Sequence, residues 1–285
     1  MKKILLPTDF SENAYNALCY GLKIAQKTGA DVLFFHANHV PIIIPDTPTT
    51  MYESVIANED KRQLEALVKL KDKLFKQLNI TPEQVKADCM VKPGFAVDAI
   101  VEVVKDENIG LIVMGTKGAS GIKKLLLGSN TASIIKKVDC PVLAVPDTAQ
   151  FKGIDKIVFA TDYHEINDKN VLTPLVEMAL LFDSELLIFN VKEEEEQVPS
   201  VSQAAEGLKI ETAFKPVNHS YHFSEDGDIP EAIEEFVEKT NADLLVLMPH
   251  RPNLFEQLFT TSVTKEIAFQ TKIPLLTLPE RAKKR

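Results

Sequence analysis

The sequence is poor in the features that mark secreted and membrane-spanning proteins. Its 285 residues include only three cysteines, Cys19, Cys89 and Cys140, and none of them stands in a CxxC spacing. An odd and scattered set of cysteines is typical of reduced thiols in a cytosolic protein. No apolar run approaches the length of a membrane span, and the apolar part of "MKKILLPTDF" is too short for a signal peptide. We therefore expect a cytoplasmic protein without a membrane partner.

The chain also lacks an excess of positive charge. It has 32 Lys and Arg against 41 Asp and Glu, which gives a formal net charge of −9. Coating nucleic acid requires clustered Lys and Arg that neutralise phosphates, so we do not expect nucleic acid as a partner. The basic C-terminal "RAKKR" is interpreted as a solvated tail.

Motifs of common catalytic machinery are absent as well. There is no GxSxG elbow, no HExxH and no GxxxxGK[ST] P-loop. The histidines show no helical metal spacing, and His219 and His222, three apart on an expected strand, would point to opposite faces. No residue stands out that would orient a nucleophile for phosphoryl transfer. We expect no catalytic residue, no protein-bound metal and no enzyme, although slow ATP hydrolysis stays open.

What the chain does contain is a long internal repeat. "KILLPTDFSEN" at residues 3–13 recurs as "KIVFATDYHEI" at 156–166, and "CPVLAVP" at 140–146 recurs as "IPLLTLP" at 273–279. A repeat of about 140 residues is too long for a solenoid unit and indicates a duplicated domain. The predicted domains are residues 1–148 and 153–280, and each is long enough to bury its own core.

Each half alternates short apolar runs with helical patterns. In the first half the runs lie at residues 3–8, 31–37, 85–91, 111–114 and 142–145, and the helical patterns at 13–27, 60–78, 95–105 and 129–137. Runs that are apolar throughout are typical of parallel strands buried on both faces. The alternation predicts an α/β fold with a parallel sheet between helices.

Two stretches break the symmetry between the halves. Residues 38–60 are predicted to be a long loop that packs on a partner domain, with a nucleotide lid as the alternative. The corresponding place in the second half holds "KEEEEQ" at 192–197, which is predicted to be a solvated loop.

The glycine-rich stretch "MGTKGASGIKKLLLGSNTA" at 114–132 predicts a phosphate cradle. In an open parallel sheet, ligands bind beyond the carboxyl ends of the strands, where the topology switches direction. Gly115 and Gly118 would let backbone N–H groups approach an anion, and Gly128 would return the chain to a helix start that also attracts anions. The Ser129 and Thr131 hydroxyls and the lysines at 117, 123 and 124 would add donors and charge.

Two further interpretations concern the residues around this cradle. The plainer explanation of the glycines is a simple turn with Ser129 as a helix N-cap, but the strand–loop–helix context favours the cradle. Asp9, at the end of the first strand, would be repelled by phosphate. We expect it on the ribose or base, or on a bridging Mg²⁺, which takes oxygen ligands.

Each half resembles a universal stress protein domain. The likeness rests on "KILLPTDFSE", "CPVLAVP" and the spacing G-x2-G-x9-G-S at Gly115, Gly118, Gly128 and Ser129, which is similar to the signature of the family's ATP-binding branch. It implies two tandem doubly wound domains, adenine-nucleotide α-hydrolase-like, each with a five-stranded parallel sheet in the order 3-2-1-4-5. The nucleotide-binding residues that it implies are Pro7, Thr8, Asp9, Ala37, Met114, Gly115, Gly118, Gly128, Ser129 and Asn130.

The second half keeps the scaffold but not the glycines. The corresponding positions are Asp162, Val191, Met248, Pro249 and Thr260-Thr261. Pro249 has no N–H to donate, and the side chains of His250 and Arg251 would occupy the phosphate region. We expect this half not to bind ATP, so that replacing His250 and Arg251 leaves nucleotide affinity unchanged.

Together with the resemblance, which implies a role in the stress response, these observations predict a regulatory module that binds one ATP, with or without Mg²⁺, in its first domain. The alternative is a scaffold that acts through protein contacts and keeps a vestigial glycine loop. An enzyme of the related adenine-nucleotide α-hydrolase group is disfavoured because HIGH-like and SGGxDS-like stretches are absent. The fifth strands are apolar edges that need cover, so we expect the halves to pair through them as a pseudo-dimer. A homodimer of whole chains stays open.

Overall fold

The computed structural model describes residues 2–38, 49–116, 127–161, 163, 169–191, 201–224, 229–248 and 272–279. The first half contains β1 (Lys3–Pro7), α1 (Glu12–Thr28), β2 (Asp31–Asn38), α2 (Thr49–Leu78), β3 (Ala87–Pro93), α3 (Ala96–Asp106), β4 (Leu111–Gly115), α4 (Ser129–Lys137) and β5 (Val142–Val145). The second half contains β6 (Lys156–Ala160), the 3-10 helix η1 (Lys169–Leu172), α5 (Thr173–Phe182), β7 (Glu185–Val191), α6 (Val201–Phe214), β8 (His219–Ser224), α7 (Ile229–Thr240), β9 (Leu244–Leu247) and β10 (Leu275–Thr277).

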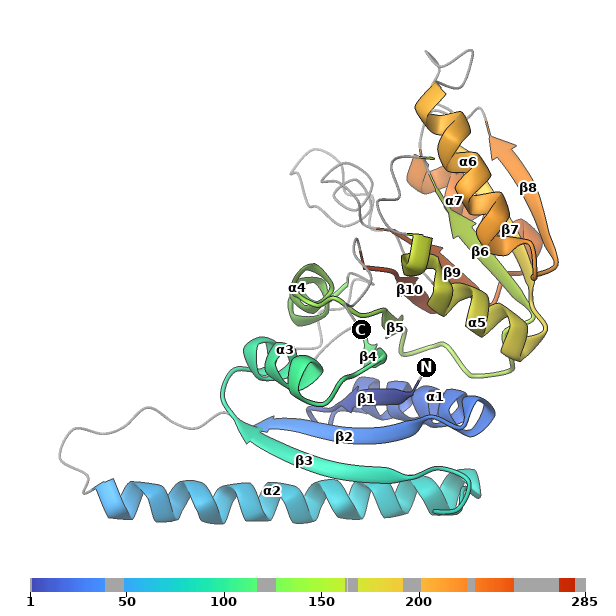
Figure 1. Cartoon of the computed structure of the whole chain (residues 1–285). Helices are drawn as coiled ribbons and strands as arrows, with labels where there is room; N and C mark the ends of the chain where they lie inside the picture. The colour runs from blue at the N-terminus through green and yellow to red at the C-terminus, as the bar shows by residue number, and fades with distance from the viewer. Residues whose placement is uncertain are drawn as a thin grey trace.

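The described strands form one continuous ten-stranded sheet in the order β3-β2-β1-β4-β5-β10-β9-β6-β7-β8 (Figure 1). Within each half every pair is parallel, and each half has the order 3-2-1-4-5. The predicted fold class is therefore confirmed. The two halves meet at β5 and β10, which pair antiparallel with Leu143 opposite Leu276.

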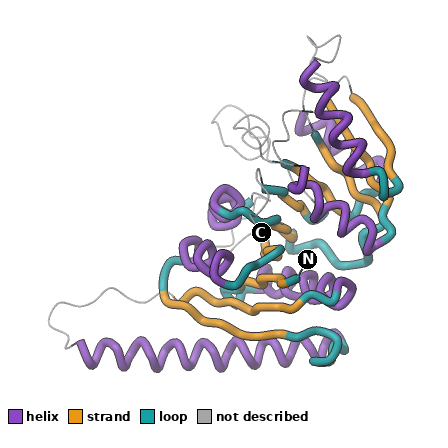
Figure 2. The backbone as a smooth tube through the Cα atoms, in the orientation of Figure 1, coloured by secondary structure: helices purple, strands orange, loops and turns teal. Residues whose placement is uncertain are grey.

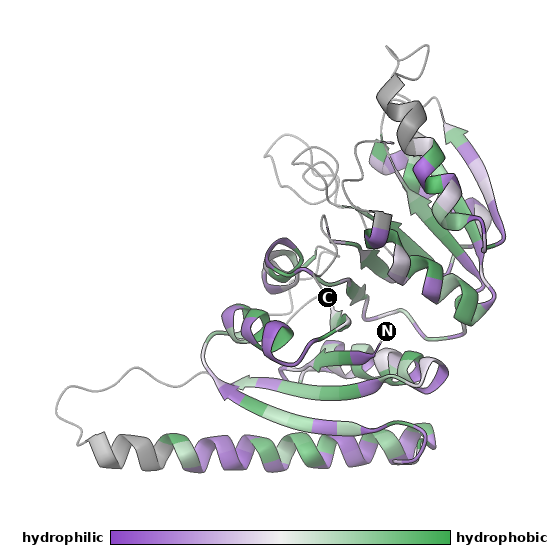
Figure 3. Ribbon diagram, in the orientation of Figure 1, coloured by the Kyte–Doolittle hydropathy of each residue, from purple (hydrophilic) through white to green (hydrophobic). Residues whose placement is uncertain are grey.

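Helices cover both faces of this sheet, as the layers in Figure 2 show. One core cluster holds side chains of α1, α2, α5 and α6 and runs across both halves. On the opposite face α3 and α4 pack on the first half and α7 packs on the second. The inner strands carry apolar residues almost throughout and are largely green in Figure 3, whereas the outer strands β3 and β8 also carry polar residues. This arrangement leaves the strand ends, rather than the strand faces, for contact with ligands.

The first helix follows directly from its sequence. Ser11 caps its start, because the Ser11 side chain accepts a hydrogen bond from the Ala14 N–H at 3.2 Å. Gly29 ends it in the left-handed region, with φ of 67°. The predicted apolar stripe is buried, from Ala14 through Leu18 and Leu22 to Ala25. α1 therefore packs closely on β1 and β4.

The prediction of a loop over the whole of residues 38–60 is wrong for its second part. α2 begins at Thr49 and runs for 30 residues. Residues 49–59 contain no Gly or Pro, and Glu59 forms hydrogen bonds with Arg62 and Gln63 one turn later along the helix. Residues 39–48, with the apolar stretch at 42–44, and the acidic loop at 192–197 lie outside the described residues. Neither α2 nor any other described helix offers an apolar segment that could cross a bilayer.

Candidate functional site

The ends of β1, β2 and β4 meet at one edge of the sheet. β1 pairs with β2 on one side and with β4 on the other, both parallel. Asp9 lies two residues after the end of β1, Ala37 is the second-last residue of β2, and Thr116 directly follows β4. The chain leaves β1 towards β2 on one side and reaches β4 on the other, so this edge is the topological switch point of the first half. The predicted adenosine and phosphate segments are thus brought together.

A tight turn follows β1 at this edge. The Thr8 N–H donates to the Phe35 carbonyl at 2.8 Å, and the Phe10 N–H donates to Thr8 Oγ1 at 2.9 Å. Phe10 adopts a φ of 63°, a conformation that side chains other than glycine rarely take. His36 Nδ1 lies 2.8 Å from the Thr8 carbonyl, and because a carbonyl only accepts, Nδ1 carries the proton. The ring of Phe10 covers the His36 ring at 4.7 Å between centroids.

The same turn follows β6 in the second half. The Thr161 N–H donates to the Phe189 carbonyl at 2.9 Å, and the Tyr163 N–H to Thr161 Oγ1 at 3.2 Å. Tyr163 has a φ of 53°. Asn190 Nδ2 donates to the Thr161 carbonyl at 2.8 Å, in the role that His36 has in the first half. The turn is therefore a property of the duplicated scaffold.

Sequence reasoning missed this supporting shell, although a signal was present. His36 and Asn190 occupy the same place in the repeated stretches "DVLFFHA" and "ELLIFNV". Both side chains offer an N–H at a similar reach, so a shared hydrogen-bonding role could have been inferred from the repeat itself.

The other segment of the edge joins β4 to α4. The Gly128 N–H donates to the Thr116 carbonyl at 2.5 Å, so both ends of the intervening stretch lie side by side. Thr131 is buried, and its hydroxyl donates to the Gly115 carbonyl at 3.0 Å. This bond holds the start of α4 against the end of β4. It also makes the predicted phosphate contact of the Thr131 hydroxyl wrong, because that donor is already used inside the protein.

The start of α4 keeps unused hydrogen-bond donors. Its N-cap is Gly128, which has no side chain to cap the helix, and Ser129 is the first helical residue rather than the cap. Within the described part of the chain, no partner accepts from the backbone N–H of Ser129, Asn130 or Thr131. The side chains of Ser129 and Asn130 are exposed. A helix start of this kind presents donors and a partial positive charge to an anion.

The remaining predicted residues lie at the same edge with differing exposure. Asp9 is exposed, and its Oδ1 accepts from the Ser11 N–H at 3.0 Å. Pro7, Thr8, Met114 and Gly115 are buried, while Ala37 and Gly128 are half-buried. The Met114 and Ala37 side chains belong to the core on the α3 and α4 face, so a ligand would meet their backbone. Gly118 and the lysines at 117, 123 and 124 lie outside the described residues.

α2 brings carboxylates towards the same edge. Asp60 Oδ1 accepts from Asn38 Nδ2 at 2.8 Å, which ties α2 to the end of β2. One residue earlier, hydrogen bonds from Arg62 and Gln63 are the main cause that lowers the pKa of Glu59 to about 2, and His36 contributes to the same shift. The β2 side of the edge is therefore acidic, whereas the α4 side offers N–H donors. That polarity fits a ligand with its anionic group towards α4.

The second half is described only in part at the matching edge. Thr161 and Met248 are half-buried, and Val191 ends β7. Asp162, Pro249, His250, Arg251 and Thr260-Thr261 lie outside the described residues, as do Phe255, Leu258 and Phe259. Among the residues that are described, no cluster of three or more His, Cys, Asp or Glu could hold a metal ion. His219 contacts Phe214 of α6 and His222 contacts Phe236 of α7, so these two histidines do lie on opposite faces.

Comparison with known proteins agrees with this architecture. A model of the universal stress protein family matches residues 1–146 and again residues 153–279. The chain belongs to the universal stress protein family. A tandem universal stress protein of Synechocystis sp. is 26% identical over 298 residues, which span 97% of this chain and 99% of the relative.

Two further universal stress proteins illustrate the single-domain and tandem forms. One from Methanocaldococcus jannaschii is 30% identical over 154 residues, which cover 50% of this chain and 94% of the relative. The crystal structure of one from Archaeoglobus fulgidus covers 98% of both chains with a TM-score of 0.69 at 19% identity, and so shares the fold. The duplication read from the sequence is thus the tandem arrangement of this family.

Proposed function

We propose that this universal stress protein is an ATP-binding regulatory module that holds one nucleotide in its first domain. One observation carries the proposal: the uncapped start of α4 lies at the switch point, beside the ends of β1 and β4. Its first N–H groups, which have no acceptor among the described residues, suit the phosphates. The G-x2-G-x9-G-S spacing, which resembles the signature of the family's ATP-binding branch, supports the same assignment.

The other residues at this edge would contact two chemically different parts of the nucleotide, the phosphates and the adenosine. Ser129 and Asn130 would donate to phosphate oxygens. Gly115, Gly118 and Gly128 have no side chain and would let the phosphates approach the backbone closely, although the Gly128 N–H itself is already bonded to the Thr116 carbonyl. Asp9 would be repelled by phosphate and is suited to the ribose hydroxyls, or to a Mg²⁺ ion that bridges the phosphates. The backbone of Ala37, at the end of β2, would meet the adenine. Pro7, Thr8 and Met114 would shape the floor without donating side-chain hydrogen bonds.

The second domain is proposed to serve as the structural partner of the first. β10 lies against β5, which would otherwise be an open apolar edge. Because β5 is covered by β10 of the same chain, association of two whole chains would have to use a surface other than this edge strand. We propose no catalytic role, and an output that depends on conformation or partner exchange. The scattered free thiols fit the cytoplasm as the place of action.

A charge at the α4 start tests the nucleotide site without harming the helix. Ser129→Glu puts a carboxylate on the first helical residue, where the helix dipole favours negative charge by about 0.3–1 kcal/mol. The same carboxylate would repel the phosphates. We expect isothermal titration to give one ATP per wild-type chain, and at least tenfold weaker binding by the variant at a melting temperature no lower than that of the wild type.

Thr173→Glu is the matched control for this experiment. Thr173 is the exposed first residue of α5 in the second half, so the variant adds the same charge to a helix start away from the site. It should bind ATP like the wild type. Titration with ADP, AMP and cyclic AMP, each with and without Mg²⁺, would identify the preferred nucleotide. No binding of any nucleotide by the wild-type chain would favour the scaffold alternative, and turnover of bound ATP would favour an enzyme.

A further inference from the structure

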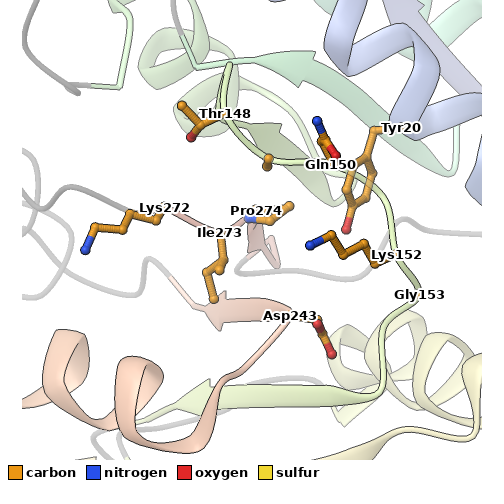
Figure 4. A pocket seen from close by; sticks show the side chains of 10 residues that line it. Tyr20, Thr148, Gln150, Lys152, Gly153, Asp243, Lys272, Ile273 and Pro274 are labelled. Carbon is orange, nitrogen blue, oxygen red and sulfur yellow. The ribbon is translucent and has the colours of Figure 1, made fainter.

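A pocket of about 260 Å³ lies where the two halves join (Figure 4). Its walls come from α1, from the linker that follows β5, and from the residues just before β9 and β10. They include Tyr20, Ala149, Lys152, Asp243, Ile273 and Pro274. None of the predicted nucleotide-binding residues lines it. The pocket is therefore separate from the switch point of the first half.

The hydroxyl of Tyr20 is the unusual group in this pocket. Tyr20 is only 3% exposed, and its ring packs edge-on against Phe151 at 4.9 Å between centroids. Its hydroxyl makes no hydrogen bond with any described residue, yet in Figure 4 it points into the pocket. Buried tyrosine hydroxyls usually find a partner, since leaving one unpaired costs about 1–3 kcal/mol. A molecule in the pocket, either water or a ligand, would supply the missing hydrogen-bond partner of the Tyr20 hydroxyl.

The charges around the hydroxyl define that molecule further. Lys152 extends into the pocket and forms no ion pair with any residue that the structure describes. By contrast, Lys272 is already paired with Glu238 at 2.7 Å. A free ammonium group and a tyrosine hydroxyl facing one pocket are suited to a carboxylate.

Asp243 supplies an acceptor on the opposite side. Its Oδ2 accepts from the N–H groups of Asp155 and Lys156 at 2.9 and 3.0 Å, which orients the carboxylate. Within the described residues, Oδ1 has no such partner. After burial, the charge of Asp243 is the second cause that raises the pKa of Tyr20, so the carboxylate lies within electrostatic reach of the hydroxyl. Asp243 would accept from an ammonium or hydroxyl group on the ligand.

We propose that this pocket binds a small carboxylic acid that also carries a hydrogen-bond donor, such as an amino acid or a hydroxy acid. Its carboxylate contacts Lys152 and the Tyr20 hydroxyl, and its amine or hydroxyl contacts Asp243. Ile273, Pro274 and Ala149 supply the apolar wall. The volume is slightly below the range of about 300–1,000 Å³ that holds drug-sized ligands, which suits a compact metabolite. Because both halves and the linker line the pocket, the bound acid bridges the two domains.

Titration of the full chain tests the proposal. The probes are the twenty amino acids, lactate and malate, followed by thermal shift and then calorimetry. We expect at least one probe to bind with Kd below about 1 mM. Tyr20→Phe and Lys152→Met should each weaken that binding about tenfold, because each removes one bond to a charged group. Propionate, an acid without the second donor, should bind at least tenfold more weakly than alanine or lactate.

Two matched variants control for general effects. Tyr15→Phe removes a hydroxyl on the same helix that points to Gln77, and Lys27→Met removes a lysine from the end of that helix. Both should bind the acid like the wild type. The proposal is overturned if no probe binds, if Tyr20→Phe and Lys152→Met bind as well as the controls, or if a crystal structure at saturating acid shows only ordered water in the pocket.

Discussion

Gly21 is the position where one added methyl group has a calculable effect on this fold. It lies inside α1, and a Cβ built there would stand 2.4 Å from Leu6 Cδ2 and 3.3 Å from Val113 Cβ. Leu6 and Val113 are fully buried on β1 and β4. The Leu6 contact is about 1 Å shorter than ordinary carbon–carbon contacts of about 3.5–4.0 Å. Gly21→Ala therefore forces the helix away from the sheet or a side chain out of its rotamer.

Two opposing terms decide the outcome of Gly21→Ala. Alanine favours a helix over glycine by about 1 kcal/mol. Overpacking a closed core costs about 1–3 kcal/mol, and the short contact with a buried side chain puts this site in the upper part of that range. We expect a net loss of about 1–2 kcal/mol in the free energy of unfolding, because overpacking exceeds the propensity gain.

Gly207→Ala is the matched control, since Gly207 is also inside a helix. A Cβ at Gly207 would have no atom within 4 Å, so only the propensity term applies. We expect this variant to be more stable than the wild type by about 0.5–1 kcal/mol. Urea unfolding followed by circular dichroism would measure both variants against the wild type.

The same pair of variants connects packing to the proposed site. Leu6 and Val113 come directly before Pro7 and Met114, at the strand ends that would hold the nucleotide. Gly21→Ala should therefore weaken ATP binding, while Gly207→Ala should not. If Gly21→Ala proved as stable as Gly207→Ala, the close packing of α1 on β1 and β4 would be refuted.

Two further predictions concern single hydrogen bonds. Thr131→Val removes the bond to the Gly115 carbonyl and should lower the free energy of unfolding by about 1–3 kcal/mol, measured by urea titration. Thr131→Ser keeps the hydroxyl and should lose less stability. Equal losses in the two variants would contradict the role of the hydroxyl. His219 faces two acceptors, the Val217 carbonyl at 2.8 Å and Glu211 Oε2 at 3.2 Å. Burial opposes protonation of His219, but these acceptors together raise its pKa, while hydrogen bonds from Tyr221 and His219 lower that of Glu211. Stabilisation by His219 is then full below its unfolded pKa of about 6.5, and it is lost as pH rises through the folded pKa. Stabilisation by Glu211 is present above its unfolded pKa of about 4.3, and it is lost as pH falls through the folded pKa. The melting-temperature difference between the wild type and His219→Gln should be larger near pH 5.5 than at pH 8.5. In a Glu211→Gln background, this difference should depend much less on pH. A difference that does not change with pH would contradict the pairing of His219 with Glu211.

Much of the fold was predictable because its signals are local. The start of α4 at Ser129 and its end at Lys137 agree with the prediction, since a glycine precedes the helix and two lysines close it. The parallel strands were predicted from continuous apolar runs such as 142–145, which need burial on both faces. The start of α2 was missed because a proline-rich stretch precedes it, and the loop assignment was carried past the last proline.

The features that escaped prediction depend on residues far apart in the chain. The Thr131 hydroxyl is committed to Gly115 only because β4 and α4 fold back on one another. Tyr20 and Asp243 share a pocket, yet no spacing in the sequence connects a residue of α1 with one that precedes β9.

The turn after the first strand of each half belongs to the shared fold and does not by itself form the proposed nucleotide site. Both halves keep it, with His36 and Asn190 in equivalent hydrogen bonds, so this turn alone cannot make one half bind a nucleotide and the other not. The predicted difference in nucleotide binding would come from the stretch after the fourth strand of each half, where Gly115 in the first half corresponds to Pro249 in the second. A proline offers no N–H and cannot contribute to an anion-binding backbone. One ATP per chain is therefore the expected stoichiometry, and a second bound ATP would place the anion site in the shared turn rather than in the glycine loop.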